Sequence, residues 1–106
     1  MARETIGPFE FDLLASLIQQ PRDAYGLSLR DRLEERLERK VSLGAVYTAL
    51  ERLEAKGMIS SWWSEGTAER GGRRKRLYRI EAPGERAARQ FVARFQGIPL
   101  AAGGVV

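Results

Sequence analysis

The hydrophobic pattern of this chain changes its period at Gly57. Before Gly57, apolar residues recur every three or four positions, which is typical of amphipathic helices. The clearest stretch covers residues 42–57, where Ser42 suits an N-cap and Gly57 a C-terminal end. Its apolar stripe consists of Leu43, Val46, Leu50 and Leu53. After Gly57, the segment Met58–Glu65 is rich in Ile, Ser and Trp and predicts a strand, so the fold must combine helices with strands.

Two earlier helices are predicted on the same grounds. The first covers residues 8–20, with Pro8 in its first turn and Pro21 after its end. The second covers residues 25–40, which leaves a turn of only a residue or two around Val41 before the third helix. The apolar stripes are Phe9, Leu13 and Leu17 in the first helix and Leu29, Leu33 and Leu37 in the second. A short turn between amphipathic helices indicates a helix-turn-helix.

A hairpin and a last helix complete the predicted fold. A second strand is expected over Leu77–Glu81, starting near Lys75, and a loop rich in glycine and arginine over residues 66–74 makes the hairpin a wing. Pro83 opens a helix that runs to about residue 96. The predicted fold class is mainly α with a small β-hairpin, a winged helix-turn-helix in the order α-α-α-β-β-α.

The elements also suggest how the chain is divided. We expect a winged helix-turn-helix DNA-binding domain over residues 1–81, a C-terminal dimerisation helix over 82–97 and a flexible tail over 98–106. A chain of 106 residues buries only about two-thirds of its unfolded surface, so a second copy would stabilise it. The last helix has an apolar face that only the first helix or a partner could cover, and its expected dimer contacts are Ala88, Phe91, Val92 and Phe95.

The composition excludes several function classes. The chain has no cysteine and no histidine, which removes disulfides, the common metal ligands and the usual nucleophile systems. Glu34, Glu35 and Glu38 could suggest an acid pair, but on a charged helix face we expect them to be solvated. We therefore expect no catalytic residue, no metal, no cofactor and no enzyme. The apolar run Phe11–Ile18 is too short to span a membrane and contains Asp12, and no signal peptide is apparent, so a cytoplasmic protein is expected.

Positive charge is concentrated in the predicted wing. The chain has a formal net charge of +4, whereas residues 66–80 alone carry six basic side chains and one acidic one. Such a segment suits contacts with nucleic-acid phosphates. A solvated hairpin tip is the alternative interpretation. The expected DNA-binding residues of the wing are Arg70, Arg73, Arg74, Lys75 and Arg76.

The third helix would present its polar face to DNA. Helix-turn-helix proteins insert the N-terminal turns of their second helix into the major groove. Once the apolar stripe is buried, the residues left outside are Ser42, Gly44, Ala45, Tyr47, Thr48 and Arg52. Gly44 and Ala45 are small enough to allow close approach of the backbone, and Arg52 can bind a phosphate or a guanine. Tyr47 could instead cover an edge of the core.

Two adjacent tryptophans, Trp62 and Trp63, occur in the first predicted strand. They could form a stacking platform for single-stranded nucleic acid. Strand alternation favours a different arrangement, in which one ring packs the hairpin onto the core and the other points outward.

Three motifs together resemble the PadR family of transcription regulators. They are DAYG at residues 23–26, SLGAVYTALERLEAKG at residues 42–57 and ERGGRRKRLYRI at residues 69–80. The resemblance extends over nearly all of residues 7–96. It implies a bacterial regulator, usually a repressor, that dimerises through C-terminal helices and binds double-stranded DNA at inverted repeats. It also implies that the polar face of helix 42–57 enters the groove.

The chain departs from the family pattern at its C-terminal end. Glu81 stands where the family usually has a threonine that caps the last helix, and only one short helix follows. The chain therefore resembles the short branch of the family. Some short relatives bind flat aromatic drugs between their dimer helices, which makes a small-molecule effector near Phe95 an open question.

Two other function classes stay open at this point. Winged helices also serve as protein-interaction adaptors that do not bind DNA, and the fold alone does not decide between the two roles. The wing charge favours DNA binding over the adaptor. An enzyme is the weakest alternative, because the sequence contains no convincing catalytic set.

Overall fold

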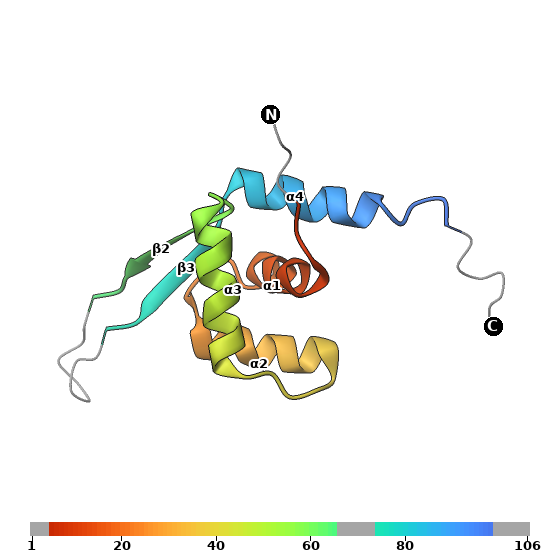
Figure 1. Ribbon diagram of the computed structural model, residues 1–106. Coiled ribbons are helices and arrows are strands. Elements are labelled where there is room, and N and C mark those ends of the chain that lie inside the picture. The colour runs from red at the N-terminus through yellow and green to blue at the C-terminus, as the bar shows by residue number, and fades with distance from the viewer. Residues whose placement is uncertain (1–4, 66–73, 99–106) are drawn as a thin grey trace.

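The computed structural model describes residues 5–65 and 74–98 of the chain. Its elements are α1 (Pro8–Gln19), β1 (Ala24–Tyr25), α2 (Gly26–Leu37), α3 (Leu43–Ala55), β2 (Ile59–Trp63), β3 (Arg76–Ile80) and α4 (Ala82–Ala93). The helix order and the hairpin confirm the predicted fold class, which is mainly α with a small sheet. Figure 1 shows the hairpin on one side of the molecule and the end of α4 on the other.

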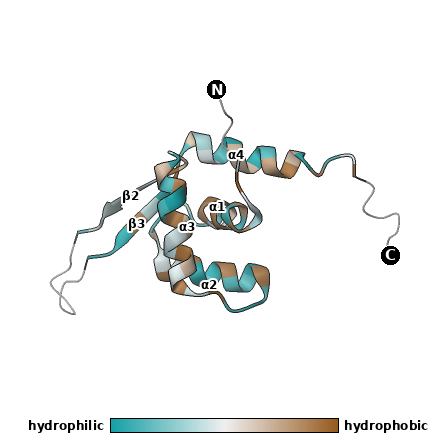
Figure 2. Ribbon diagram, viewed as in Figure 1, coloured by the Kyte–Doolittle hydropathy of each residue, from teal (hydrophilic) through white to brown (hydrophobic). Residues whose placement is uncertain are grey.

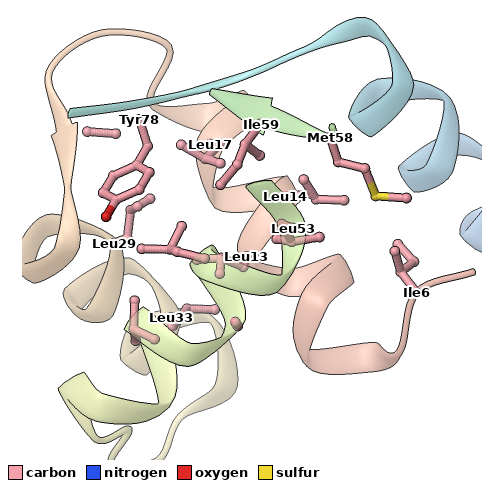
Figure 3. Packing of buried hydrophobic residues seen from close by; sticks show 14 of the residues in the cluster. Ile6, Leu13, Leu14, Leu17, Leu29, Leu33, Leu53, Met58, Ile59 and Tyr78 are labelled. Atoms are coloured by element: carbon pink, nitrogen blue, oxygen red, sulfur yellow. The ribbon is translucent and has the colours of Figure 1, made fainter. Parts of the chain in front are cut away.

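The three N-terminal helices enclose a leucine-rich core (Figure 3). The predicted apolar stripes supply it, because Leu13, Leu17, Leu29 and Leu33 are buried together with Val46, Leu50 and Leu53. Pro8 starts α1 as predicted, and the side chain of Ser42 caps α3 by accepting a hydrogen bond from the Ala45 N–H at 3.0 Å. These contacts fix the polar face of α3 on the outside of the molecule.

In the part of the chain that the structure describes, the sheet has three strands rather than the predicted two. The strand order is β1-β3-β2, and both pairs are antiparallel. In β1, Ala24 pairs with Tyr78 and Tyr25 pairs with Leu77. Two residues are too few to show an alternating pattern, which is why the hydrophobic pattern does not predict β1. Its consequence is functional, because β1 attaches the wing to the start of α2.

The turn between α2 and α3 is longer than predicted. The helix ends at Leu37 rather than at residue 40, because Glu38 adopts a left-handed conformation with φ of 55°. The turn therefore covers residues 38–42. The Val41 N–H donates a hydrogen bond to Glu34 Oε2 at 2.9 Å. The expectation that Glu34 is simply solvated was therefore wrong, since its half-buried carboxylate holds this turn closed.

Helix α4 crosses α1. The rings of Phe11 and Phe91 stack with their centroids 4.7 Å apart. Gly84 lies against the carbonyl oxygen of Met58, so the start of α4 packs on the chain just before β2. None of the helices in residues 5–65 and 74–98 combines the length and apolar character needed to cross a membrane.

Candidate nucleic-acid interface

The outer face of α3 and its N-cap carry every residue of helix 42–57 that the sequence assigned to DNA contact. These six residues, all exposed, are Ser42, Gly44, Ala45, Tyr47, Thr48 and Arg52. A Cβ atom built on Gly44 would meet no other atom within 4 Å, so the helix backbone is open to solvent there. The N-terminal half of α3 therefore presents small and hydroxyl side chains over an accessible backbone.

Five of the six residues divide between two grooves on the flanks of α3. One groove of about 550 Å³ brings together Ser42, Ala45, Thr48 and Arg52, and Arg39 from the preceding turn also lines it. Arg39 was not among the predicted site residues, because the sequence pattern placed it inside helix 25–40. The early end of α2 instead leaves its exposed guanidinium beside the N-terminus of α3.

Tyr47 lies on the other flank, next to the wing. It lines a groove of about 630 Å³ with Tyr25, Trp63 and the three wing cations Arg74, Lys75 and Arg76. Its ring also covers the start of α2, where it lies against Gly26. With 41% of its surface exposed, Tyr47 combines the two interpretations offered by the sequence. It covers a packing edge and still presents surface to a ligand.

Arg52 lies further along α3, near the start of α1. Its Nη1 atom is 4.0 Å from Glu10 Oε2, and 58% of its side chain is exposed. The same carboxylate, which is largely buried, accepts hydrogen bonds from Lys56 Nζ at 3.4 Å. Lys56 is therefore the closer partner of Glu10, and the guanidinium of Arg52 stays accessible.

The wing cations that the structure describes lie on aromatic rings. Lys75 Nζ is 4.1 Å from the centroid of the Tyr25 ring. The guanidinium carbons of Arg74 and Arg76 are 6.0 Å and 5.3 Å from the centroid of the Trp63 ring. Predicted residues Arg70 and Arg73 lie outside the described residues. Stacking of this kind restricts the cations while their charges remain at the surface.

Neither tryptophan packs onto the core, which contradicts the expectation from strand alternation. Trp62 is 41% exposed and Trp63 is 54% exposed. The physical reason is the length of the hairpin, which extends beyond the helices so that the outer half of β2 has no core to face (Figure 1). Arg79 covers Trp62 on one face of the hairpin, with its guanidinium carbon 5.4 Å from the ring centroid, and Trp63 faces α3.

Two ionisable groups near the sheet have shifted pKa values. Burial raises the pKa of the Tyr78 phenol above its ordinary value of 10.0, and the neighbouring Tyr47 acts in the same direction. A hydrogen bond from the Ser60 hydroxyl lowers the pKa of the Glu81 carboxyl below its ordinary value of 4.5. Glu81 therefore binds a strand residue, and its side chain makes no capping hydrogen bond to α4.

A second surface, formed by α1 and α4, lies away from the wing. Of the predicted dimer contacts, Ala88 is buried within the chain and Phe91 is half-buried, whereas Val92 and Phe95 are 48% and 49% exposed. Ile18 and Ile98, which were not predicted, are also about half-exposed, at 49% and 46%. Figure 2 shows apolar colouring on the last turns of α4. We call Ile18, Val92, Phe95 and Ile98 the apolar patch.

Comparison with known proteins gives a consistent result. A family model described as the transcriptional regulator PadR-like family matches residues 13–90. A PadR family regulator from Eggerthella lenta DSM 2243 is 26% identical, with a TM-score of 0.64, over 78% of this chain and 70% of that chain. A PadR family regulator from Clostridium difficile R20291 is 26% identical, with a TM-score of 0.61, over 80% of this chain and 85% of that chain. The curated proteins offer no match.

One similar structure contains DNA. Bacillus subtilis PadR in complex with operator DNA has a TM-score of 0.69 over 91% of this chain and 53% of that chain. At 17% identity, this likeness concerns the fold alone. The family model, in contrast, matches the sequence itself from α1 through α3 and the two strands of the hairpin into α4. The chain therefore belongs to the PadR-like family of transcriptional regulators.

Proposed function

We propose that this chain represses transcription by binding double-stranded DNA at an inverted-repeat operator as a homodimer. In this proposal, α3 enters the major groove and the wing contacts the adjacent backbone. The observation that carries it is the position of the three cations Arg74, Lys75 and Arg76 beside the exposed face of α3. A helix face that reads bases and a cationic segment that binds phosphates are the two parts of a DNA-binding site.

The positive charge of this surface comes from the wing rather than from α3. Arg52 and Lys56 of the α3 segment are offset by Glu51 and Glu54, so the helix contributes little net attraction. The wing supplies the positive charge instead. We therefore assign the affinity for the backbone to the wing and the choice of sequence to α3, with Arg39 as an additional contact beside the helix N-terminus.

The apolar patch supports the homodimer. Ile18 and Val92 line one groove between α1 and α4, and exposed apolar side chains that gather on a surface are typical of an interaction site. Phe91 and Ala88 lie beneath the patch and would support it from inside the chain. A two-fold dimer presents two copies of α3, which is the reason to expect an operator with inverted half-sites. Occupation of a promoter by such a dimer would block transcription, and the cytoplasm is where this role would be carried out.

The experiment is a binding titration of the purified chain. The probe is a labelled duplex from the region upstream of its own gene, beside a scrambled duplex of equal length and composition. The proposal predicts tighter binding to the native duplex and a steep loss of affinity with salt. Equal affinity for both duplexes would contradict sequence-specific binding. Failure to bind either duplex at low salt would favour the adaptor role.

A further inference from the structure

Three side chains from three elements form a chain of hydrogen bonds between α3 and the wing, which we call the relay. The Ser61 hydroxyl of β2 donates to the Glu54 carboxylate of α3, with both oxygens at 2.8 Å. Arg76 of β3 donates from Nε to the Ser61 hydroxyl oxygen at 2.9 Å. All three side chains are half-buried, so water competes less with these bonds than it would on an open surface.

The relay holds Arg76 without neutralising it. Within residues 5–65 and 74–98, its guanidinium forms no ion pair, and the Ser61 hydroxyl connects it to Glu54 through hydrogen bonds. In the described part of the chain, Arg76 donates through Nε alone, and the centroid of the Trp63 ring lies 5.3 Å from the guanidinium carbon. The terminal nitrogens, which form the fork that binds phosphate, are left for a ligand.

The surroundings of Arg76 indicate what that ligand is. Arg76 lines the groove of about 630 Å³ between α3 and the wing, where Arg74, Lys75 and the exposed Tyr47 also lie. The three cations outnumber the two carboxylates that also line this groove, Glu51 and Glu54, so the groove favours an anionic group such as a phosphate. The half-buried Glu54 is engaged by Ser61 and is the relay's anchor rather than a contact.

We propose that Glu54 and Ser61 are positioning residues that aim the Arg76 guanidinium at a DNA backbone phosphate beside the recognition helix. The inference rests on the proposed DNA binding and deepens it. An arginine side chain has large rotamer entropy, so a relay that fixes it before binding reduces the cost of ordering it in the complex. The relay also makes the angle of the wing depend on α3, which couples the phosphate contact to the helix that reads the bases.

The matched pair Ser61→Val and Ser61→Thr tests this directly. Val and Thr have nearly the same shape and both favour strands, but only Thr keeps the hydroxyl. We expect Ser61→Thr to bind the native duplex like the wild type. Ser61→Val should bind it about three- to tenfold more weakly, and its salt slope should fall by about one, toward that of Arg76→Ala. Equal binding by Ser61→Val and Ser61→Thr would overturn the inference.

A double-mutant cycle separates positioning from general damage to the fold. If Ser61 acts through Arg76, then Ser61→Val should cost nothing further in DNA affinity when Arg76 is already Ala. An equal loss with and without Arg76 would show that Ser61 acts only on the structure, and would overturn the inference. Wild-type affinity in Arg76→Ala would do the same.

A readout without DNA separates this inference from the proposed function. The chain has two tryptophans, so Trp62→Phe leaves Trp63 as the only reporter. In that background, Ser61→Val should change the Trp63 emission by releasing Arg76 from the ring, and Ser61→Thr should not. Unchanged emission in both variants would overturn the relay even if DNA binds. A wild type that binds no duplex would overturn the proposed function, and the positioning role with it.

Discussion

The phenol of Tyr47 occupies the space that a side chain on Gly26 would need. A Cβ atom on Gly26 would overlap the Tyr47 hydroxyl, and it would come within 2.8 Å of the ring carbon Cε1. The first residue of α2 is thus small because the Tyr47 ring of α3 lies against it. This contact sets the position of Tyr47 at the edge of the groove between α3 and the wing.

Gly26→Ala should therefore weaken DNA binding while leaving the fold intact. Tyr47 is 41% exposed and can rotate outward, so we expect a small change in melting temperature. We expect a loss of DNA affinity of about three- to tenfold, the size of one displaced contact. In a Tyr47→Ala background, the same substitution at Gly26 should have no further effect on affinity. Wild-type affinity in Gly26→Ala would contradict a DNA-contacting role for the present position of Tyr47.

Gly44→Ala should change stability and DNA affinity in opposite directions. Nothing within the chain meets the added methyl group, and Ala favours helix over Gly by up to about 1 kcal/mol, so thermal stability should rise. DNA affinity should fall, because the methyl group would hold the backbone of α3 away from the groove. Gln90→Ala, on an exposed position of α4, is the control that should leave affinity unchanged. Unaltered DNA affinity in Gly44→Ala would exclude close backbone approach at this residue.

Val92→Glu should dissociate the proposed dimer. A carboxylate at Val92 would bring a charge into the apolar patch, and its burial in an interface would cost its hydration. Leu27→Glu is the matched control, because Leu27 on α2 is 44% exposed and Val92 on α4 is 48% exposed. Sedimentation velocity at micromolar concentration should give a dimer for the wild type and for Leu27→Glu, and a monomer for Val92→Glu. A monomeric wild type would refute the dimer.

Glu81 should make the fold sensitive to acid. The hydrogen bond from Ser60 lowers the pKa of Glu81 in the folded chain, so its charged form stabilises the fold. This stabilisation is present above the ordinary pKa of 4.5 and is lost as the pH falls through the lower folded pKa. Melting temperatures measured from about pH 6 to about pH 3 should fall less steeply for Ser60→Ala and Glu81→Gln than for the wild type. Three parallel curves would contradict this role of Glu81.

Gly84 is a position where even a methyl group should disturb the fold. A Cβ atom there would overlap the backbone carbonyl of Met58, which cannot rotate away as a side chain can. We expect Gly84→Ala to lower the free energy of unfolding by about 1–3 kcal/mol, as overpacking of a core does. Chemical denaturation should detect this loss. An unchanged denaturation midpoint would show that α4 can shift on the sheet without loss of stability.

The sequence predicted the helices well where an apolar stripe and a capping residue agree. Residues 42–57 have both, and α3 lies within them, with Ser42 as its cap. The end of α2 was placed too late because Glu38, rather than a glycine, takes up the left-handed conformation. Strand β1 has only two residues, and its pairing with β3 depends on tertiary contacts that leave no local pattern.

The sequence predicted which elements form the candidate site, but not the hydrogen bonds that connect them. The exposed face of α3 could be predicted because its apolar stripe must be buried. The wing could be predicted as a binding segment because it concentrates so many basic residues. Arg39 was missed because its position beside the N-terminus of α3 results from the early end of α2. Ser61 was missed because a serine in a strand gives no signal of its own, and its role depends on Glu54 and Arg76 meeting it from two other elements.

The salt dependence of operator binding tests the central claim most directly. We expect Lys75→Ala and Arg74→Ala each to flatten the plot of log affinity against log salt by about one unit, because each removes a phosphate contact. Arg86→Ala removes the same charge from an exposed position on α4 and should leave the slope unchanged. Equal slopes for the wild type and all three variants, or an equal decrease at Arg86, would contradict the assignment of DNA binding to α3 and the wing.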